Sequence, residues 1–199
     1  MSSSLLIITF FAAGMLLSWA GWLPSLLADE ALTVWLLYAL MFTVGLSVGA
    51  DKRLREILRT LRPSVLLVPL ATTIGTFAGV ALVSLVLRYS ITECLAVGAG
   101  FGYYSLSSVF ITQYKGAELG TVALLANILR ELITLLGAGL MVRYCGKLAP
   151  VCAGGCTTTD TTLPVITRFA GKDMVFIAIV HAMVLDLSVP LWVLFFCSF

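Results

Sequence analysis

The sequence predicts an all-α polytopic membrane protein, and three observations support this fold class. Hydrophobic residues make up 60% of the 199 residues, charged residues make up only 11%, and the mean hydropathy is +1.08. A soluble core does not bury so much apolar surface, whereas a lipid bilayer accepts it. The apolar residues also form long runs rather than alternating short strands, which favours a helical bundle.

Five of the apolar runs approach or exceed the ~20 residues that a spanning helix needs. We expect spanning helices at residues 5–23, 31–50, 64–87, 119–142 and 174–199. Glycine and hydroxyl residues interrupt two further runs, at 94–112 and 149–167, so we expect broken helices there, either re-entrant or crossing.

The chain is expected to form a single transmembrane domain at 1–199. Within it we distinguish a three-helix part at 1–92 and two units that each combine a broken segment with a long helix, at 93–142 and 143–199.

Basic residues predict the orientation of the helices. Five of the twelve lysines and arginines lie within residues 51–62, which the positive-inside rule places in the cytoplasm. The N-terminus is then cytoplasmic and the C-terminus lies outside. The first apolar run is long and has no basic residue before it, so we expect an uncleaved helix. Re-entrant broken segments fit the charge bias better than crossing ones.

The two broken units resemble each other at a shift of 55 residues. Gly100 aligns with Gly155, and Glu131 aligns with Asp186. Re-entrant segments would make this an inverted repeat, the arrangement that alternating access uses, whereas crossing segments would make the repeats parallel. Identities are few, so duplication and chance resemblance both stay open.

The breaks themselves predict a binding site. The first contains glycines, tyrosines and serines, including Ser105, and the second contains five threonines, including Thr157 and Thr162, together with Asp160. Non-helical backbone at membrane depth is tolerated only inside protein or beside water. The alternative is that the small residues allow close helix packing while Ser and Thr bond to their own helices.

Charged residues within the predicted spans also indicate a functional interior. A charge there costs at least ~2.5–3.5 kcal/mol unless it faces a cavity or a partner. Glu131 shares a helix face with Asn127, and both are candidates for substrate binding and proton coupling. Arg130 points about 100° away and is interpreted as a structural counter-ion for Asp160 or Asp186.

Two further ionisable residues lie in the last predicted span. Asp186 precedes Pro190 by four residues, so it belongs either to the site or to a kink in the helix. His181 fits hydrogen-bonded packing better than a proton relay.

The sequence gives little support for enzyme chemistry, a cofactor or a metal. It contains no nucleophile elbow, zinc-protease motif or phosphate-binding loop. Cys152 and Cys156 are four residues apart, but no second Cys or His pair stands nearby, so we interpret them as small apolar filler rather than metal ligands. We expect no nucleic-acid partner.

Four segments resemble the LysO-type lysine exporters of bacterial inner membranes. They are GFGYYSLSS at 100–108, NILRELI at 127–133, GGCTTTDTTLP at 154–164 and DMVFIAIVHAMVLDLSVP at 173–190. The likeness is most specific where Asn127, Arg130 and Glu131 fall on the family's Asn-x-x-Arg-Glu. It is equally specific where Asp160, Thr162 and Pro164 fall on its Asp-x-Thr-Leu-Pro.

This resemblance implies export of L-lysine and its analogue thialysine, driven by a cation gradient, with Glu131 and Asp160 as the essential intramembrane acids. The chain resembles only the C-terminal, longer portion of single-chain members. It is therefore expected to work with a small partner membrane protein or as a homo-oligomer. A channel or carrier for another small solute and a non-transporting membrane subunit remain as alternatives.

Overall fold

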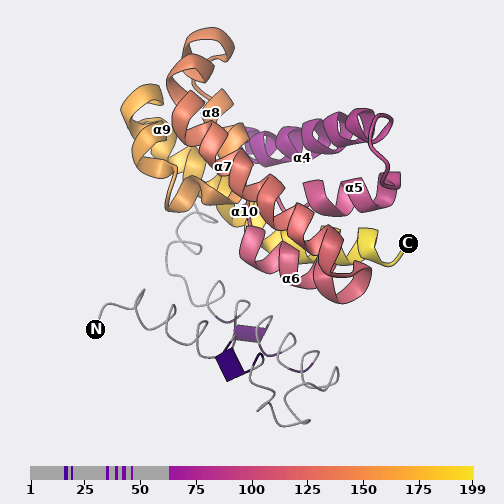
Figure 1. The fold of residues 1–199 in the computed structure, drawn as a ribbon. Coiled ribbons are helices and arrows are strands. Elements are labelled where there is room, and N and C mark those ends of the chain that lie inside the picture. Colours follow the sequence, from indigo (N-terminus) through magenta and orange to yellow (C-terminus); the bar gives the residue numbers. More distant parts are fainter. Residues whose placement is uncertain are drawn as a thin grey trace. The chain divides into compact units, whose positions relative to one another are not determined.

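The computed structural model describes residues 63–199 and a few isolated helical positions between residues 16 and 46. Contacts divide the chain into two units, Met1–Asp51 and Lys52–Phe199. The second unit contains all of the helices labelled in Figure 1. The predicted spans at 5–23 and 31–50 and the basic segment at 51–62 lie outside the continuously described residues.

Three described helices are long and apolar enough to cross a membrane. They are α4 (Pro63–Ser84), α7 (Ala117–Cys145) and α10 (Met174–Cys197). The predicted spans at 64–87, 119–142 and 174–199 are thereby confirmed as helices of this kind. Apolar side chains surround each helix instead of forming one stripe, as is typical of helices whose outer surface faces lipid.

The first broken segment forms α5 (Ile91–Gly98) and α6 (Tyr104–Lys115). Ser90 caps α5, because its hydroxyl accepts from the Glu93 N–H and the Glu93 carboxylate accepts from the Ser90 N–H at 2.8 Å. The hydrogen bond from the Ser90 N–H, followed by that from the Ser90 hydroxyl, lowers the pKa of the Glu93 carboxyl below its ordinary value. The helix therefore begins sharply after the loop that leaves α4.

The two ends of this segment lie at the same end of α7. The Tyr89 hydroxyl, just before α5, donates to the Glu118 carboxylate at the start of α7 over 2.9 Å. Since α6 leads directly into α7 through Gly116, α6 returns to the end from which α5 starts. We call residues 91–115 the first hairpin and residues 99–103, where the helix is interrupted, the first tip.

The second broken segment forms a hairpin at the opposite end of α7. It contains α8 (Ala149–Gly154), the 3-10 helix η2 (Gly155–Thr159) and α9 (Leu163–Ala170). Val151 of α8 and Ala170 of α9 belong to one buried cluster, against which Val142 near the end of α7 also packs. We call residues 149–170 the second hairpin and residues 155–162 the second tip. Figure 1 shows the two hairpins at the two ends of α7.

The long helices α4 and α10 run parallel to each other. His181 and Thr72 are hydrogen-bonded through Nε2 and Oγ1 at 2.9 Å. Farther along both helices, the ring of Phe77 packs edge-on against Trp192 with a centroid distance of 5.2 Å. The hairpins lie against these helices, and the fully buried side chains of Phe101, Ile111 and Ile166 fill the interior.

The two tips touch in the interior of the bundle. The Cys156 N–H donates to the Phe101 carbonyl at 2.9 Å, which joins the second tip to the first. Gly155 has φ +62°, and a Cβ atom there would overlap the Phe101 carbonyl. Both the conformation and the close approach therefore require glycine.

The tip contact predicts an unequal effect of two Gly→Ala substitutions. Gly146→Ala, at φ +91° with open space around it, should lower the free energy of unfolding by about 1–3 kcal/mol through backbone strain alone. Gly155→Ala should lower it further, because the methyl group displaces the Phe101 carbonyl. Denaturant unfolding of the purified protein in detergent measures both values. Equal losses would argue against the tip contact.

Candidate functional site

A polar pocket with a cavity volume of ≈ 220 Å³ lies where the two tips meet α7 and α10. Both hairpins and both long helices contribute to it. Its lining consists of Gly102, Tyr103, Tyr104, Ser105, Glu131, Cys156, Thr157, Thr159, Asp160, Thr161 and Asp186. The pocket thus gathers three carboxylates from three separate elements.

Two of the carboxylates are half-buried on long helices. Glu131 belongs to α7 and Asp186 to α10. Pro190 lacks the N–H that would bond to the carbonyl of Asp186, so the backbone of α10 is weakened beside the pocket. A kink-related role and a place in the pocket are therefore compatible for Asp186.

The third carboxylate, Asp160, is exposed and follows η2 in the second tip. Its Oδ1 accepts from the Thr161 N–H at 2.6 Å. Within residues 63–199, Oδ2 accepts no hydrogen bond, so it is available to a ligand. An exposed carboxylate in a membrane protein must face water or further protein rather than lipid.

Threonine hydroxyls of the second tip form hydrogen bonds with backbone carbonyls at the same tip. Thr157 donates to the Gly154 carbonyl at 2.9 Å, and its hydroxyl lies 3.2 Å from that of Thr162. Thr158 is within hydrogen-bond distance of the carbonyls of Gly155 and Ala178. Of the predicted site residues, Ser105 and Thr157 line the pocket, whereas Thr162 is buried behind Thr157.

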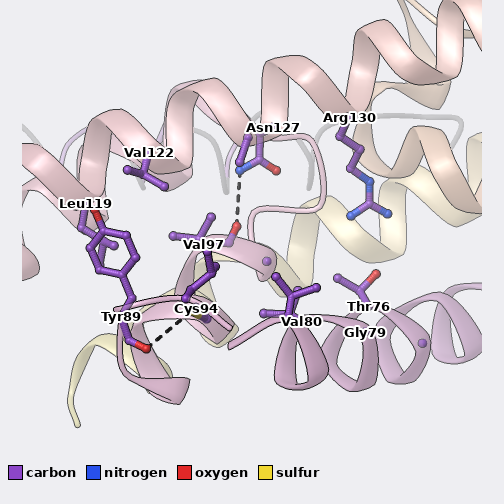
Figure 2. Close-up of a pocket in the computed structure, with 15 residues that line it drawn as sticks. Thr76, Gly79, Val80, Tyr89, Cys94, Val97, Leu119, Val122, Asn127 and Arg130 are labelled. Carbon is purple, nitrogen blue, oxygen red and sulfur yellow. Dashed lines mark hydrogen bonds between the residues drawn. The ribbon is translucent and has the colours of Figure 1, made fainter. Parts of the chain in front are cut away.

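Asn127 lies outside the polar pocket and contacts the first tip. Its Oδ1 accepts from the Gly102 N–H at 2.8 Å, and its Nδ2 donates to the Ala123 carbonyl at 2.8 Å. A longer bond of 3.4 Å to the Val97 carbonyl is visible in Figure 2. Asn127 therefore bonds to the backbone of the first hairpin, although we expected it beside Glu131 in the substrate site.

Arg130 has carbonyl partners instead of the expected carboxylate. Its Nε donates to the Ala153 carbonyl at 2.7 Å, and its Nη2 donates to the Cys152 carbonyl at 3.0 Å. These carbonyls belong to the last turn of α8, where a cation is favoured by the helix dipole. Among residues 63–199, these carbonyls are the hydrogen-bond partners of Arg130, where we expected Asp160 or Asp186.

A larger cavity of ≈ 480 Å³ lies between α4, α5 and α7 (Figure 2). Apolar side chains such as Val80, Val97 and Leu119 line most of it, and its lining contains no carboxylate. It offers few groups that could orient a polar molecule. The smaller pocket at the tips is the better candidate site.

Sequence reasoning missed the structural role of two residues that build the site. Phe101 was not singled out, and Cys156 was interpreted as apolar filler, yet their backbones join the tips. One signal was present: the shift of 55 residues aligns Phe101 with Cys156. His181, in contrast, does not line the polar pocket. Its side chain is fully buried and is hydrogen-bonded to Thr72.

Three long apolar helices and two hairpins that meet at an acidic interior pocket define a polytopic helical membrane protein with an internal polar site. Comparison with known proteins identifies its family. Residues 8–197 match the family described as Lysine exporter LysO, and the chain belongs to that family. The description is that of a transporter rather than an enzyme.

Two relatives are similar over most of this chain. Lysine exporter LysO of Escherichia coli (strain K12) is 35% identical over 164 residues, which are 81% of this chain and 54% of that protein. A putative lysine exporter of Haemophilus influenzae is 33% identical over 167 residues, 83% of this chain and 84% of that protein. The chain thus spans about half the length of the first relative. No solved structure is significantly similar to this fold.

Two serines on α6 test whether the pocket holds water. Ser105 is exposed at the pocket and Ser107 is fully buried. In a background in which the exposed Cys145 is changed to Ser, Ser105→Cys should react with a charged thiol reagent at least about tenfold faster than Ser107→Cys, because only a wetted thiol ionises readily. Labelling followed by mass spectrometry gives both rates. Similar rates would contradict a wetted pocket.

Proposed function

We propose that this protein exports L-lysine, and its analogue thialysine, across the bacterial inner membrane. The observation that carries the proposal is the convergence of Glu131, Asp160 and Asp186 on one pocket. Carboxylates inside a membrane protein mark a pathway for cations or protons. Membership of the lysine exporter family and the names of both relatives support the same substrate.

The pocket offers complementary groups for both ends of a lysine molecule. Its carboxylates suit the two ammonium groups. The first turn of α6, from Tyr104, also lines the pocket, and within the described residues no side chain caps this helix start. Its positive dipole end and the hydroxyl of Ser105 suit the carboxylate of the substrate.

We propose further that the two hairpins are re-entrant and belong to an inverted repeat. The hairpins start from opposite ends of α7, which supports this topology. Residues that align at the shift of 55 also meet in space: Phe101 bonds to Cys156, and the pairs Ser105 with Asp160 and Glu131 with Asp186 line one pocket. Such meetings are expected where a pseudo-two-fold axis passes through a transport site.

Transport would then proceed by alternating access, with protons or another cation as the coupling ion. Protonation of Glu131 or Asp160 weakens its hold on an ammonium group and releases lysine outward. In the orientation proposed from the basic residues, the Glu118 end of α7 faces outside and the Val142 end faces the cytoplasm. The first hairpin then enters from outside and the second from the cytoplasm.

Isosteric removal of the acids tests the coupling. Glu131→Gln and Asp160→Asn should each reduce lysine efflux at least about tenfold, because each loses a charge that compensates the substrate in a low-dielectric site. The matched control is Glu118→Gln, which removes an acid of the same helix at its outer end. Efflux is measured in cells lacking their own exporter and normalised to protein in the membrane. Full efflux from both acid variants would refute the mechanism.

A partner polypeptide is also part of the proposal, either a small membrane protein encoded nearby or a second copy of this chain. The exposed Asp160 and Ser105 leave room for further protein beside the pocket. Expression of this chain alone and together with its neighbour separates these arrangements. Efflux only with the neighbour would indicate a two-component exporter, and efflux from this chain alone would indicate a homo-oligomer.

The same cells decide between lysine and another cargo. If both proteins reach the membrane and no lysine efflux follows, lysine is excluded. A channel or carrier for a different small solute, or a non-transporting subunit, would then explain the fold.

A further inference from the structure

We infer that Asn127 and Arg130 are positioning residues, which from adjacent turns of α7 hold the tips of both hairpins against each other and thereby fix the spacing of the pocket carboxylates. The inference deepens the proposed function and depends on it only for the identity of the cargo. Neither side chain needs to touch the substrate for this role.

Asn127 supports the first tip. It is only 4% exposed, and its amide accepts from the Gly102 N–H while donating to the Ala123 carbonyl. Gly102 lies at φ +95° in the break between α5 and α6, and within the described residues its N–H bonds to Asn127 and to no backbone carbonyl. Without Asn127, a buried backbone donor in the middle of the bundle would lose its partner.

Arg130 supports the second tip. Its two hydrogen bonds to Cys152 and Ala153 fix the end of α8 immediately before the tip begins. The guanidinium also lies over the ring of Phe101, with 5.8 Å to the ring centroid, and so contacts the first tip. A planar group that donates through two different nitrogens has a geometry that lysine cannot reproduce.

The tips are in turn joined to each other. The Cys156 N–H donates to the Phe101 carbonyl, and Gly102 packs so closely that a Cβ there would lie 3.1 Å from the Gly154 carbonyl. A displacement of either tip therefore breaks a bond that the other tip shares. The two supports on α7 act on a single connected unit.

This unit determines where the carboxylates lie. Asp160 directly follows η2, Glu131 directly follows Arg130, and both reach the same pocket. Phe101, whose carbonyl accepts the bond, has φ +45°, a strained value for a residue with a side chain. The surroundings must hold this conformation, and the side chain of Arg130 contributes to that.

Hydrogen exchange at the tips tests the inference without reference to cargo. The full chain in lipid nanodiscs is compared with Asn127→Ala, Asn127→Asp, Arg130→Lys and the control Thr134→Val. Thr134 is buried on the same helix, and within residues 63–199 its hydroxyl bonds only to the carbonyl of Arg130, so valine removes a bond internal to α7 and keeps the methyl group that faces Gly154. Mass spectrometry follows peptides that contain the amides of Gly102 and Cys156.

Asn127→Ala and Arg130→Lys should each raise exchange at both tips by about tenfold or more, because opening one tip releases the other. Asn127→Asp keeps the Oδ1 acceptor for Gly102 and should retain more protection than Asn127→Ala. Thr134→Val should leave both tips protected. Unchanged exchange in the middle of α10 shows that a variant is folded.

Exchange that rises only in the hairpin touched by the substituted residue would overturn the inference, and so would unchanged tips. If Asn127→Ala does not accumulate, Arg130→Lys and Asn127→Asp decide the question. Lysine efflux gives the second measurement: Arg130→Lys should raise the half-saturating lysine concentration about tenfold, as a distorted pocket requires. Coupled exchange in a protein that moves no lysine would refute the proposed function and leave the inference standing.

Discussion

This structure depends on one constraint: inside an apolar bundle, the backbone N–H and C=O groups that lie outside a helix must find hydrogen-bond partners. An unpaired N–H or C=O group there costs several kcal/mol, and lipid offers no partner. Each tip meets this demand with protein groups: the amide of Asn127, the hydroxyls of Thr157 and Thr158, and the contact between Cys156 and Phe101. The polar pocket exists at this depth because those partners make two interrupted helices tolerable.

The two tips meet the same demand in different ways, and the difference assigns them different tasks. The first tip consists of small and aromatic residues and depends on a side chain of α7 for the bond of the Gly102 N–H. The second tip bonds largely to itself through threonines, with Thr158 also reaching the Ala178 carbonyl of α10. Because it is satisfied internally, the second tip can expose Asp160, whereas the first contributes a helix start and hydroxyls. The two hairpins thus have similar backbone arrangements, but only the second tip contributes a charged side chain to the pocket.

Local signals in the sequence predicted the long described helices and both breaks, because apolar length and interruption by glycine and hydroxyl residues are readable within one window. The acids were predicted because a charge in an apolar run is exceptional. The hydrogen-bond partners of Arg130 were not predicted. A guanidinium can bond to a carboxylate or to the last carbonyls of a helix, and only the fold determines which of them lies within reach. Asn127 and Glu131 lie on the same face of α7, but their side chains point in slightly different directions. Asn127 therefore contacts the first tip, whereas Glu131 lines the pocket.

The charge of the pocket constrains how the proposed transport can be coupled. Three ionised carboxylates carry −3, whereas lysine with two ammonium groups and one carboxylate carries +1. Arg130 does not supply the difference, because its guanidinium is engaged by carbonyls of α8 and does not line the pocket. Like charges about 4 Å apart repel by roughly 4 kcal/mol at an effective dielectric constant of about 20. Under the proposed function, the loaded pocket must therefore hold protons or a second cation as well as lysine, which links the binding of cargo to that of the coupling ion. Asp160, the exposed member of the three, is the carboxylate through which exchange with the surrounding solution is easiest.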